Sequence, residues 1–143
     1  MTAREYLDQG RRLDQQISNR LEQLERLRSL TQKITVSYGG EAVSHSQNLT
    51  SLQDSIVRLM EAEQELNRQI QELVEMKVEL STVISQVRND TYRMILEERY
   101  LCFHDWNQIA RQMHYSRRWV MDKHERALAA VDSILRENGR AGA

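Results

Sequence analysis

Two neighbouring arginines, Arg117 and Arg118, directly follow Ser116 in the stretch from Trp106 to Leu128. A serine often precedes a helix, because its hydroxyl accepts a hydrogen bond from an unpaired N–H of the first turn. The arginines would then lie in that first turn. Guanidinium groups bind phosphates and the acceptor atoms of guanine, so this arrangement could read DNA. The alternative is a pair of ordinary packed helices with solvated arginines.

The residues before Ser116 fit a helix-turn-helix. Asp105 and Gln108 have the spacing of a capping box, which marks a helix start. Ala110 is a small residue where two helices could cross closely, and His114 stands four residues later at the expected sharp turn. The apolar residues predicted to hold the two helices together are Ile109, Met113, Tyr115 and Val120. Trp119 is assigned to packing between the helices.

The outward face of the second helix supplies the predicted DNA contacts. Arg117 and Arg118 would contact base edges or phosphates, while Met121 and Asp122 would tune base choice. The phosphate contacts are assigned to Arg111, Lys123 and Arg126. The predicted DNA-binding residues are therefore Arg111, Ser116, Arg117, Arg118, Met121, Asp122, Lys123 and Arg126. His114 and His124 are expected to add positive charge near the DNA.

The stretch "LEERYLCFHDWNQIARQMHYSRRWVMDKHERAL" resembles region 4 of sigma-70-type factors, the helix-turn-helix that reads the promoter −35 element. The "IARQM…SRRWV…ERAL" framework corresponds without a gap. With the helices that precede it, the chain also resembles the ArpU/RinA-like late-gene regulators of phages and prophages of Gram-positive bacteria. The resemblance implies a phage-encoded, sequence-specific transcription regulator that binds double-stranded DNA and contacts RNA polymerase.

Two rival functions remain open. A protein-interaction adaptor that contacts RNA polymerase could use the same helices. A DNA-packaging protein of the terminase small subunit kind also joins a helix-turn-helix to helical oligomerisation segments.

Other chemistry finds little support in the sequence. Cys102, His104, His114 and His124 offer metal ligands, but they lack the paired spacing of a zinc site. Glycine-rich phosphate loops and compact acid–base clusters are absent. We therefore expect no metal, no cofactor and no enzymatic activity.

The helix-turn-helix must be carried by the helices before it. Apolar residues three or four apart predict a first helix within residues 1–36, and Gly, Ser and Asn predict a flexible loop over 37–51. A 4-3-4-3 heptad seam predicts a second helix over 52–88. The seam residues are Leu52, Ile56, Leu59, Glu63, Leu66, Ile70, Leu73, Lys77, Leu80, Ile84 and Val87. A new helix start is predicted around Asn89, and residues 89–143 form the predicted DNA-binding domain.

The partner of this seam is open, since it could be the first helix, folded back antiparallel, or the same helix of a second chain in a homodimer. The sequence has no proline, and no apolar run long enough for a membrane span. One cysteine and a charged N-terminus favour a cytoplasmic protein. With a net charge of −1, DNA binding must rely on a local basic surface. The predicted fold is all-α, a long antiparallel helical hairpin (coiled coil) followed by a sigma-70-region-4-like helix-turn-helix domain.

Overall fold

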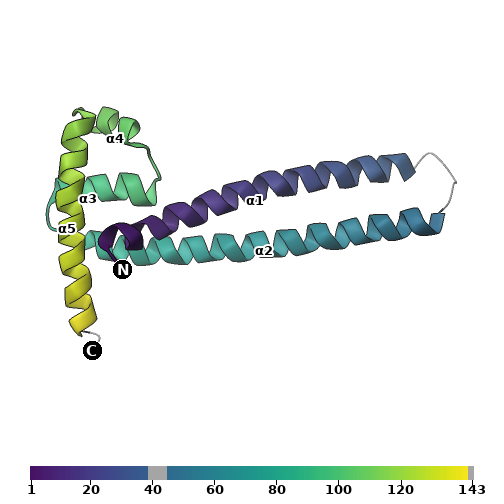
Figure 1. The fold of residues 1–143 in the computed structure, drawn as a ribbon, viewed down its shortest axis with the longest axis horizontal. Helices are drawn as coiled ribbons and strands as arrows, with labels where there is room; N and C mark the ends of the chain where they lie inside the picture. The colour runs from purple at the N-terminus through teal and green to yellow at the C-terminus, as the bar shows by residue number, and fades with distance from the viewer. Residues whose placement is uncertain (39–44, 142–143) are drawn as a thin grey trace. The chain divides into compact units, whose positions relative to one another are not determined.

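The computed structural model describes residues 1–38 and 45–141, with side chains at 1–33 and 49–139. Helices are the only regular secondary structure in these residues, so the prediction of an all-α fold is confirmed (Figure 1). The elements are α1 (Ala3–Tyr38), α2 (His45–Ser85), α3 (Asp90–Leu96), a π-helical turn η1 (Glu97–Leu101), α4 (Trp106–Met113) and α5 (Arg117–Ala141). None of the described helices has the length and apolar character needed to cross a membrane.

Contacts divide the chain into two compact units, which we describe separately. The two-helix unit comprises Asp14–Glu72 and contains parts of α1 and α2 only. The head unit comprises Met1–Leu13 and Leu73–Ala143, and thus joins the beginning of α1 to the end of α2 and all later elements.

In the two-helix unit, α1 and α2 lie side by side and run in opposite directions (Figure 1). Buried side chains from both helices fill the space between them, namely Ile17, Leu24, Leu66 and Gln69. The guanidinium of Arg28 on α1 donates two hydrogen bonds to Oε1 of Glu63 on α2, at 3.0 and 3.3 Å. The pairing of these helices within one chain therefore combines apolar packing with an ion pair.

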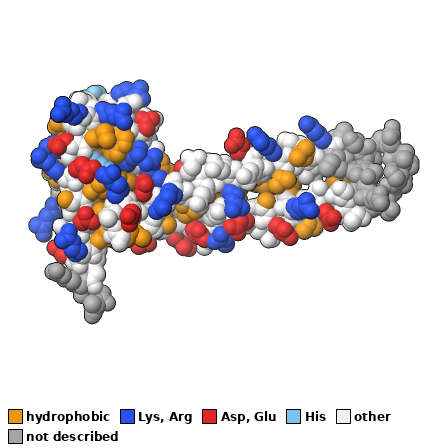
Figure 2. All heavy atoms as spheres, viewed as in Figure 1, with side chains coloured by type: hydrophobic (Ala, Val, Ile, Leu, Met, Phe, Trp, Pro, Cys, Tyr) orange, Lys and Arg blue, Asp and Glu red, His pale blue; other side chains and the backbone are white. Residues whose placement is uncertain are grey.

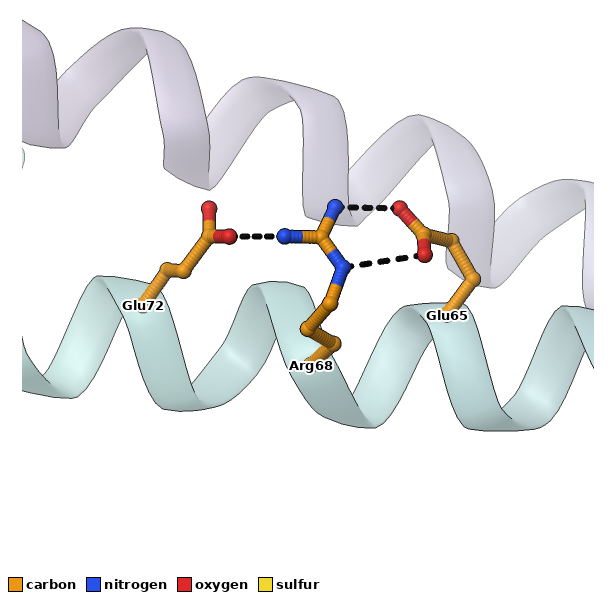
Figure 3. Close-up of polar contacts among 3 residues, drawn as sticks. All are labelled: Glu65, Arg68 and Glu72. Atoms are coloured by element: carbon orange, nitrogen blue, oxygen red, sulfur yellow. Dashed lines mark hydrogen bonds and ion pairs between the residues drawn. The ribbon is translucent and has the colours of Figure 1, made fainter.

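An arginine on α2 joins two glutamates along the helix surface (Figure 3). Arg68 donates to both carboxylate oxygens of Glu65, at 2.5 and 3.0 Å, and also pairs with Glu72. These hydrogen bonds hold the pKa of the Glu65 carboxyl below its usual range. Pairs three and four residues apart favour the helical conformation that brings them together.

The heptad seam of α2 is only partly buried. Leu66 is 6% exposed, whereas Ile56 and Ile70 are 39% and 40% exposed. One partner helix covers only one flank of a heptad stripe, and in the two-helix unit that flank holds the leucines. In the head unit, by contrast, the last three seam residues are fully buried, namely Leu80, Ile84 and Val87.

The helix boundaries differ from the predicted ones around the first connection. Of the predicted loop over 37–51, residues 37 and 38 still belong to α1, residues 39–44 lie outside the described residues, and α2 already begins at His45. No proline stops either helix, and polar residues such as Ser, Thr and Asn are well accepted in a first turn. At its other end α2 stops at Ser85, three residues before the predicted boundary.

The helix start predicted near Asn89 is confirmed. The side chain of Asn89 accepts a hydrogen bond from the Tyr92 N–H at 3.0 Å, and α3 begins at Asp90. This cap ends the long helix region and lets the chain turn into the shorter helices of the head unit.

The core of the head unit joins residues from both ends of the chain. Its buried members are Ala3, Leu7, Leu80, Val83, Ile84, Val87, Leu96, Tyr100, Ala127, Leu128 and Val131. The Ala3 N–H donates to Oδ1 of Asp132 at 2.9 Å, and Arg4 pairs with Glu125. At Gly10 an added Cβ would lie 3.3 Å from a Leu80 methyl carbon, so glycine permits the close approach of α1 to α2 there.

Candidate nucleic-acid interface

Helix α4 begins with the predicted capping box. A carboxylate oxygen of Asp105 accepts from the Gln108 N–H at 2.8 Å, and the Gln108 side chain accepts from the Asp105 N–H at 2.9 Å. Both groups are local in sequence, three residues apart, which is why the spacing alone predicted them.

The turn between α4 and α5 depends on a left-handed residue. His114 has φ 60° and ψ 37°, and its N–H reaches the carbonyl of Arg111 at 3.3 Å. The Tyr115 N–H donates to the Ala110 carbonyl at 3.1 Å, which completes the end of α4. A side chain in this conformation is strained relative to glycine. The expected sharp turn at His114 is therefore present, with a residue less suited to it than glycine.

Helix α5 begins with the predicted serine cap. Oγ of Ser116 accepts from the Trp119 N–H at 3.1 Å, and the helix starts at Arg117. Arg117 and Arg118 thus lie in the first turn, and both side chains are exposed. The positive end of the helix dipole also lies at this first turn, so an anion is favoured there.

A small apolar core holds α4 against the beginning of α5. Its buried members are Ile95, Ile109, Ala110 and Val120, with Trp106, Met113 and Trp119 packed against them. This arrangement agrees with the packing roles predicted for Ile109, Ala110, Met113, Trp119 and Val120. Helix α5 also packs along α3, so the orientation of its first turn is fixed from two sides.

The packing role predicted for Tyr115 is wrong. Its side chain is 53% exposed, and its ring stacks on Trp119 with centroids 3.8 Å apart and an angle of 14° between the planes. Nζ of Lys123 lies 5.5 Å from the centroid of the Trp119 ring. The left-handed turn at His114 directs Tyr115 away from the core, so it covers Trp119 from the solvent side instead.

The other predicted contact residues lie on the surface around this turn. Figure 2 shows Lys and Arg side chains over α4 and the first turns of α5. The exposed members are Arg111, Ser116, Arg117, Arg118, Met121, Asp122 and Arg126, and Lys123 is half-buried. Arg118, Asp122 and Arg126 are four residues apart and share one face of α5, where Nε of Arg126 lies 3.9 Å from Asp122.

Met121 has a different environment from its neighbours. It is 40% exposed and lines a cavity of about 190 Å³ in the head unit, which is also lined by Arg4, Arg99 and His124. The structure therefore places Met121 at the edge of the arginine-bearing surface, next to a cavity with charged walls.

A cluster of aromatic side chains from η1, α4 and α5 packs together. The Tyr100 hydroxyl and Nε2 of His124 share a hydrogen bond at 2.7 Å, and Trp106 packs edge-on against His124. Arg99 lies over the Trp106 ring at 4.5 Å. Sequence reasoning missed this cluster, because its members come from η1, α4 and α5 and no local spacing connects them.

The expectation that His124 adds positive charge is wrong. Burial, together with the positive charges of the nearby Arg4 and Arg99, lowers the pKa of His124 to about 4. Its imidazole is therefore neutral at physiological pH. Burial likewise raises the pKa of Tyr100 to about 12, so the hydrogen-bonded pair carries no charge.

Comparison with known families adds one match. Residues 40–132 match the model of a family described as "Protein of unknown function (DUF1492)". The chain belongs to the DUF1492 family. No curated protein and no solved structure matches the chain.

The DUF1492 match contains α2, α3, η1, α4 and the turn, together with the first four turns of α5. Every predicted contact residue of this DUF1492 chain, from Arg111 to Arg126, lies inside it. Among the described residues, no three His, Cys, Asp or Glu side chains gather closely enough to hold a metal ion. The surface presents arginine and lysine side chains and the exposed ring of Tyr115.

Proposed function

We propose that this DUF1492 protein is a sequence-specific DNA-binding transcription regulator, encoded by a phage or prophage. Its reading element is a sigma-70-region-4-like helix-turn-helix formed by α4, the turn at His114 and α5. The preceding α1 and α2 form an antiparallel coiled-coil hairpin. The hairpin offers a surface for dimerisation or for RNA polymerase.

One observation carries the proposal. Arg117 and Arg118 are exposed in the first, capped turn of a helix that a second helix holds in a fixed orientation. In helix-turn-helix proteins the beginning of the second helix enters the major groove, where arginine forms two hydrogen bonds to guanine. Asp122 lies one turn further on the same side and would accept from the amino group of cytosine.

The residues around this turn suit contacts with the DNA backbone. Arg111 on α4 and Arg126 on α5 are exposed, and each can reach a phosphate without unfolding a helix. Lys123 is held near Trp119, from which its long side chain can extend toward a phosphate. The exposed ring of Tyr115 adds a group that can pack against a sugar. Asp122 limits the net charge of this surface and would disfavour indiscriminate phosphate binding.

The first test is selection from a randomised duplex library at a stated salt concentration, followed by sequencing. An enriched motif is the expected result, and a palindromic motif would indicate binding as a dimer. Uniform recovery would contradict sequence-specific reading and favour the adaptor function.

The selected duplex then tests the arginines. Arg117→Ala with Arg118→Ala should weaken binding at least about 100-fold, because each good base contact is worth about 1–3 kcal/mol. The matched control removes two exposed arginines of the two-helix unit, Arg26→Ala with Arg58→Ala. This control loses the same charge and should change affinity only slightly. Equal losses in both double variants, measured by fluorescence anisotropy, would contradict the proposed reading element.

A further inference from the structure

The cavity of about 190 Å³ beside Met121 is lined by arginines from elements that are far apart in the sequence. Two of these arginines lie on α1 and the third lies on η1. Tyrosine, tryptophan and histidine side chains form the aromatic part of the wall. We give the name arginine cavity to the space between six residues of the head unit, namely Arg4, Arg11, Arg99, Tyr100, Trp106 and His124.

The charges around the arginine cavity do not balance. Its lining also includes two carboxylates, Asp8 and Glu125. Glu125 pairs with Arg4, and Oδ1 of Asp8 lies 3.8 Å from Nη1 of Arg11. The hydrogen-bonded tyrosine and histidine of the wall are both neutral at physiological pH. Three arginines and two carboxylates therefore leave the lining with a surplus of one positive charge.

Arg99 is the arginine of this cavity without a carboxylate. Among the described residues its hydrogen-bond acceptor is the carbonyl of His104, 3.2 Å from Nη1, and its guanidinium carbon lies 4.5 Å from the centre of the Trp106 ring. A guanidinium has five N–H donors, so most of those of Arg99 have no acceptor in the described part of the chain. Burial, together with the positive charge of Arg11, lowers the pKa of Arg99. A half-buried guanidinium in this situation is stabilised by an anion that enters from the solvent.

The donors around the arginine cavity suit a phosphate group better than a planar carboxylate. The arginine N–H groups come from two elements, and a phosphate presents its oxygens in more directions than a carboxylate does. His124 can hold its proton on Nε2 and donate it to the Tyr100 oxygen, which leaves the tyrosine O–H for an anion. The volume also suffices, because a water molecule in the liquid takes up only about 30 Å³.

From these observations we infer that the arginine cavity binds a phosphate group and that Arg99 is its principal contact. Arg4 and Arg11 keep their carboxylates and contribute positive potential. Two sources share this chemistry, a small phosphate compound free in solution and the backbone of bound DNA, since Met121 lies between the cavity and the arginine-bearing surface of α5. Only the second source rests on the proposed function.

NMR titration of the isotope-labelled full chain with sodium phosphate tests the inference, with sodium chloride added to keep the ionic strength constant. The indole N–H signal of Trp106 should shift and reach saturation. Arg99→Gln should raise the dissociation constant read from this signal at least about tenfold, because a charged hydrogen-bond donor is lost. Arg12→Gln is the matched control, since Arg12 is exposed on α1 in the same unit and is not part of the cavity lining. It should change the dissociation constant less than about twofold.

Arg99→Lys provides a second test, which also serves if the glutamine variant does not fold. It keeps the positive charge but lacks the planar fork of the guanidinium, so its dissociation constant should lie between those of the original chain and Arg99→Gln. Spectra without phosphate check that each variant is folded. A Trp106 signal that does not saturate, unchanged phosphate binding in both Arg99 variants, or an equal loss in Arg12→Gln would overturn the inference.

A titration with a short DNA duplex distinguishes the two sources of the phosphate group. If the DNA backbone is the source, the duplex moves the Trp106 indole signal and Arg99→Gln binds the duplex more weakly. If the source is a free phosphate compound, the duplex leaves this signal unchanged while sodium phosphate still moves it. A chain that binds no DNA at all would contradict the proposed function but would leave the phosphate titration as expected, so the two failures can be told apart.

Discussion

His124 shows how a single buried side chain makes the stability of the head unit depend on pH. Its pKa is about 4 in the folded protein, against 6.5 in an exposed chain. Between these values the unfolded chain binds a proton that the folded protein does not. The stabilising effect of a neutral His124 is therefore complete above pH 6.5 and is lost as the pH falls toward 4.

We expect the free energy of unfolding to fall by up to about 3 kcal/mol from this residue alone between pH 6.5 and 4. His124→Phe removes the ionisable group while keeping an aromatic ring against Tyr100 and Trp106. Urea unfolding followed by circular dichroism at a series of pH values should show a shallower decline for this variant. Equal declines in the variant and the original protein would contradict the assignment.

His114 makes a second prediction at the residue scale. Its left-handed backbone is strained for any side chain except glycine, and its side chain is exposed, so little packing is lost on replacement. His114→Gly should therefore raise the free energy of unfolding by about 0.5–1 kcal/mol. His114→Val, with a branched side chain, should lower it. A destabilised glycine variant in thermal unfolding would show that the imidazole itself stabilises the turn.

At the scale of elements, α2 has two flanks with different roles. Leu66 faces the buried space next to α1, whereas Val57 on the same helix faces solvent. Leu66→Asp buries an unpaired charge and should lower the free energy of unfolding by about 3 kcal/mol or more. Val57→Asp should change it by less than about 0.5 kcal/mol. Similar urea midpoints for the two variants would show that the leucine flank is not the one that packs.

At this scale, the sequence could predict only interactions between residues that are close together in the chain. The caps by Asn89, Asp105 and Ser116 were predictable because donor and acceptor are three residues apart. The division of the heptad seam was not, since it depends on which flank the neighbouring helix covers. The π-helical turn at Glu97–Leu101 also escaped prediction, because its residues suit an ordinary α-helix equally well.

The features of the candidate interface likewise differ in whether the sequence could predict them. The exposed arginines follow from the serine cap, and a cap is visible in the sequence. The outward position of Tyr115 and the neutrality of His124 depend on tertiary packing, which no local spacing encodes.

At the scale of the whole molecule, the charges of the chain nearly cancel, with 20 basic against 21 acidic residues. Three arginines nevertheless flank one turn, namely Arg111, Arg117 and Arg118. Few acidic residues are close to them in the sequence. A protein of this composition gains little from general attraction to DNA, so under the proposed function its affinity for DNA would come from the few contacts around this turn.

The hydrogen bond from the Ala3 N–H to Oδ1 of Asp132 joins residues that are 129 positions apart in the sequence. Such distant contacts delay folding, because the chain loses much entropy before they can form. During synthesis, Ala3 and Leu7 emerge well before the α5 residues Ala127, Leu128 and Val131, which share their core. We expect the head unit to fold after the two-helix unit, whose residues all precede Leu73. Its apolar N-terminal residues remain uncovered until then, so the growing chain passes through a stage in which chaperones can bind it.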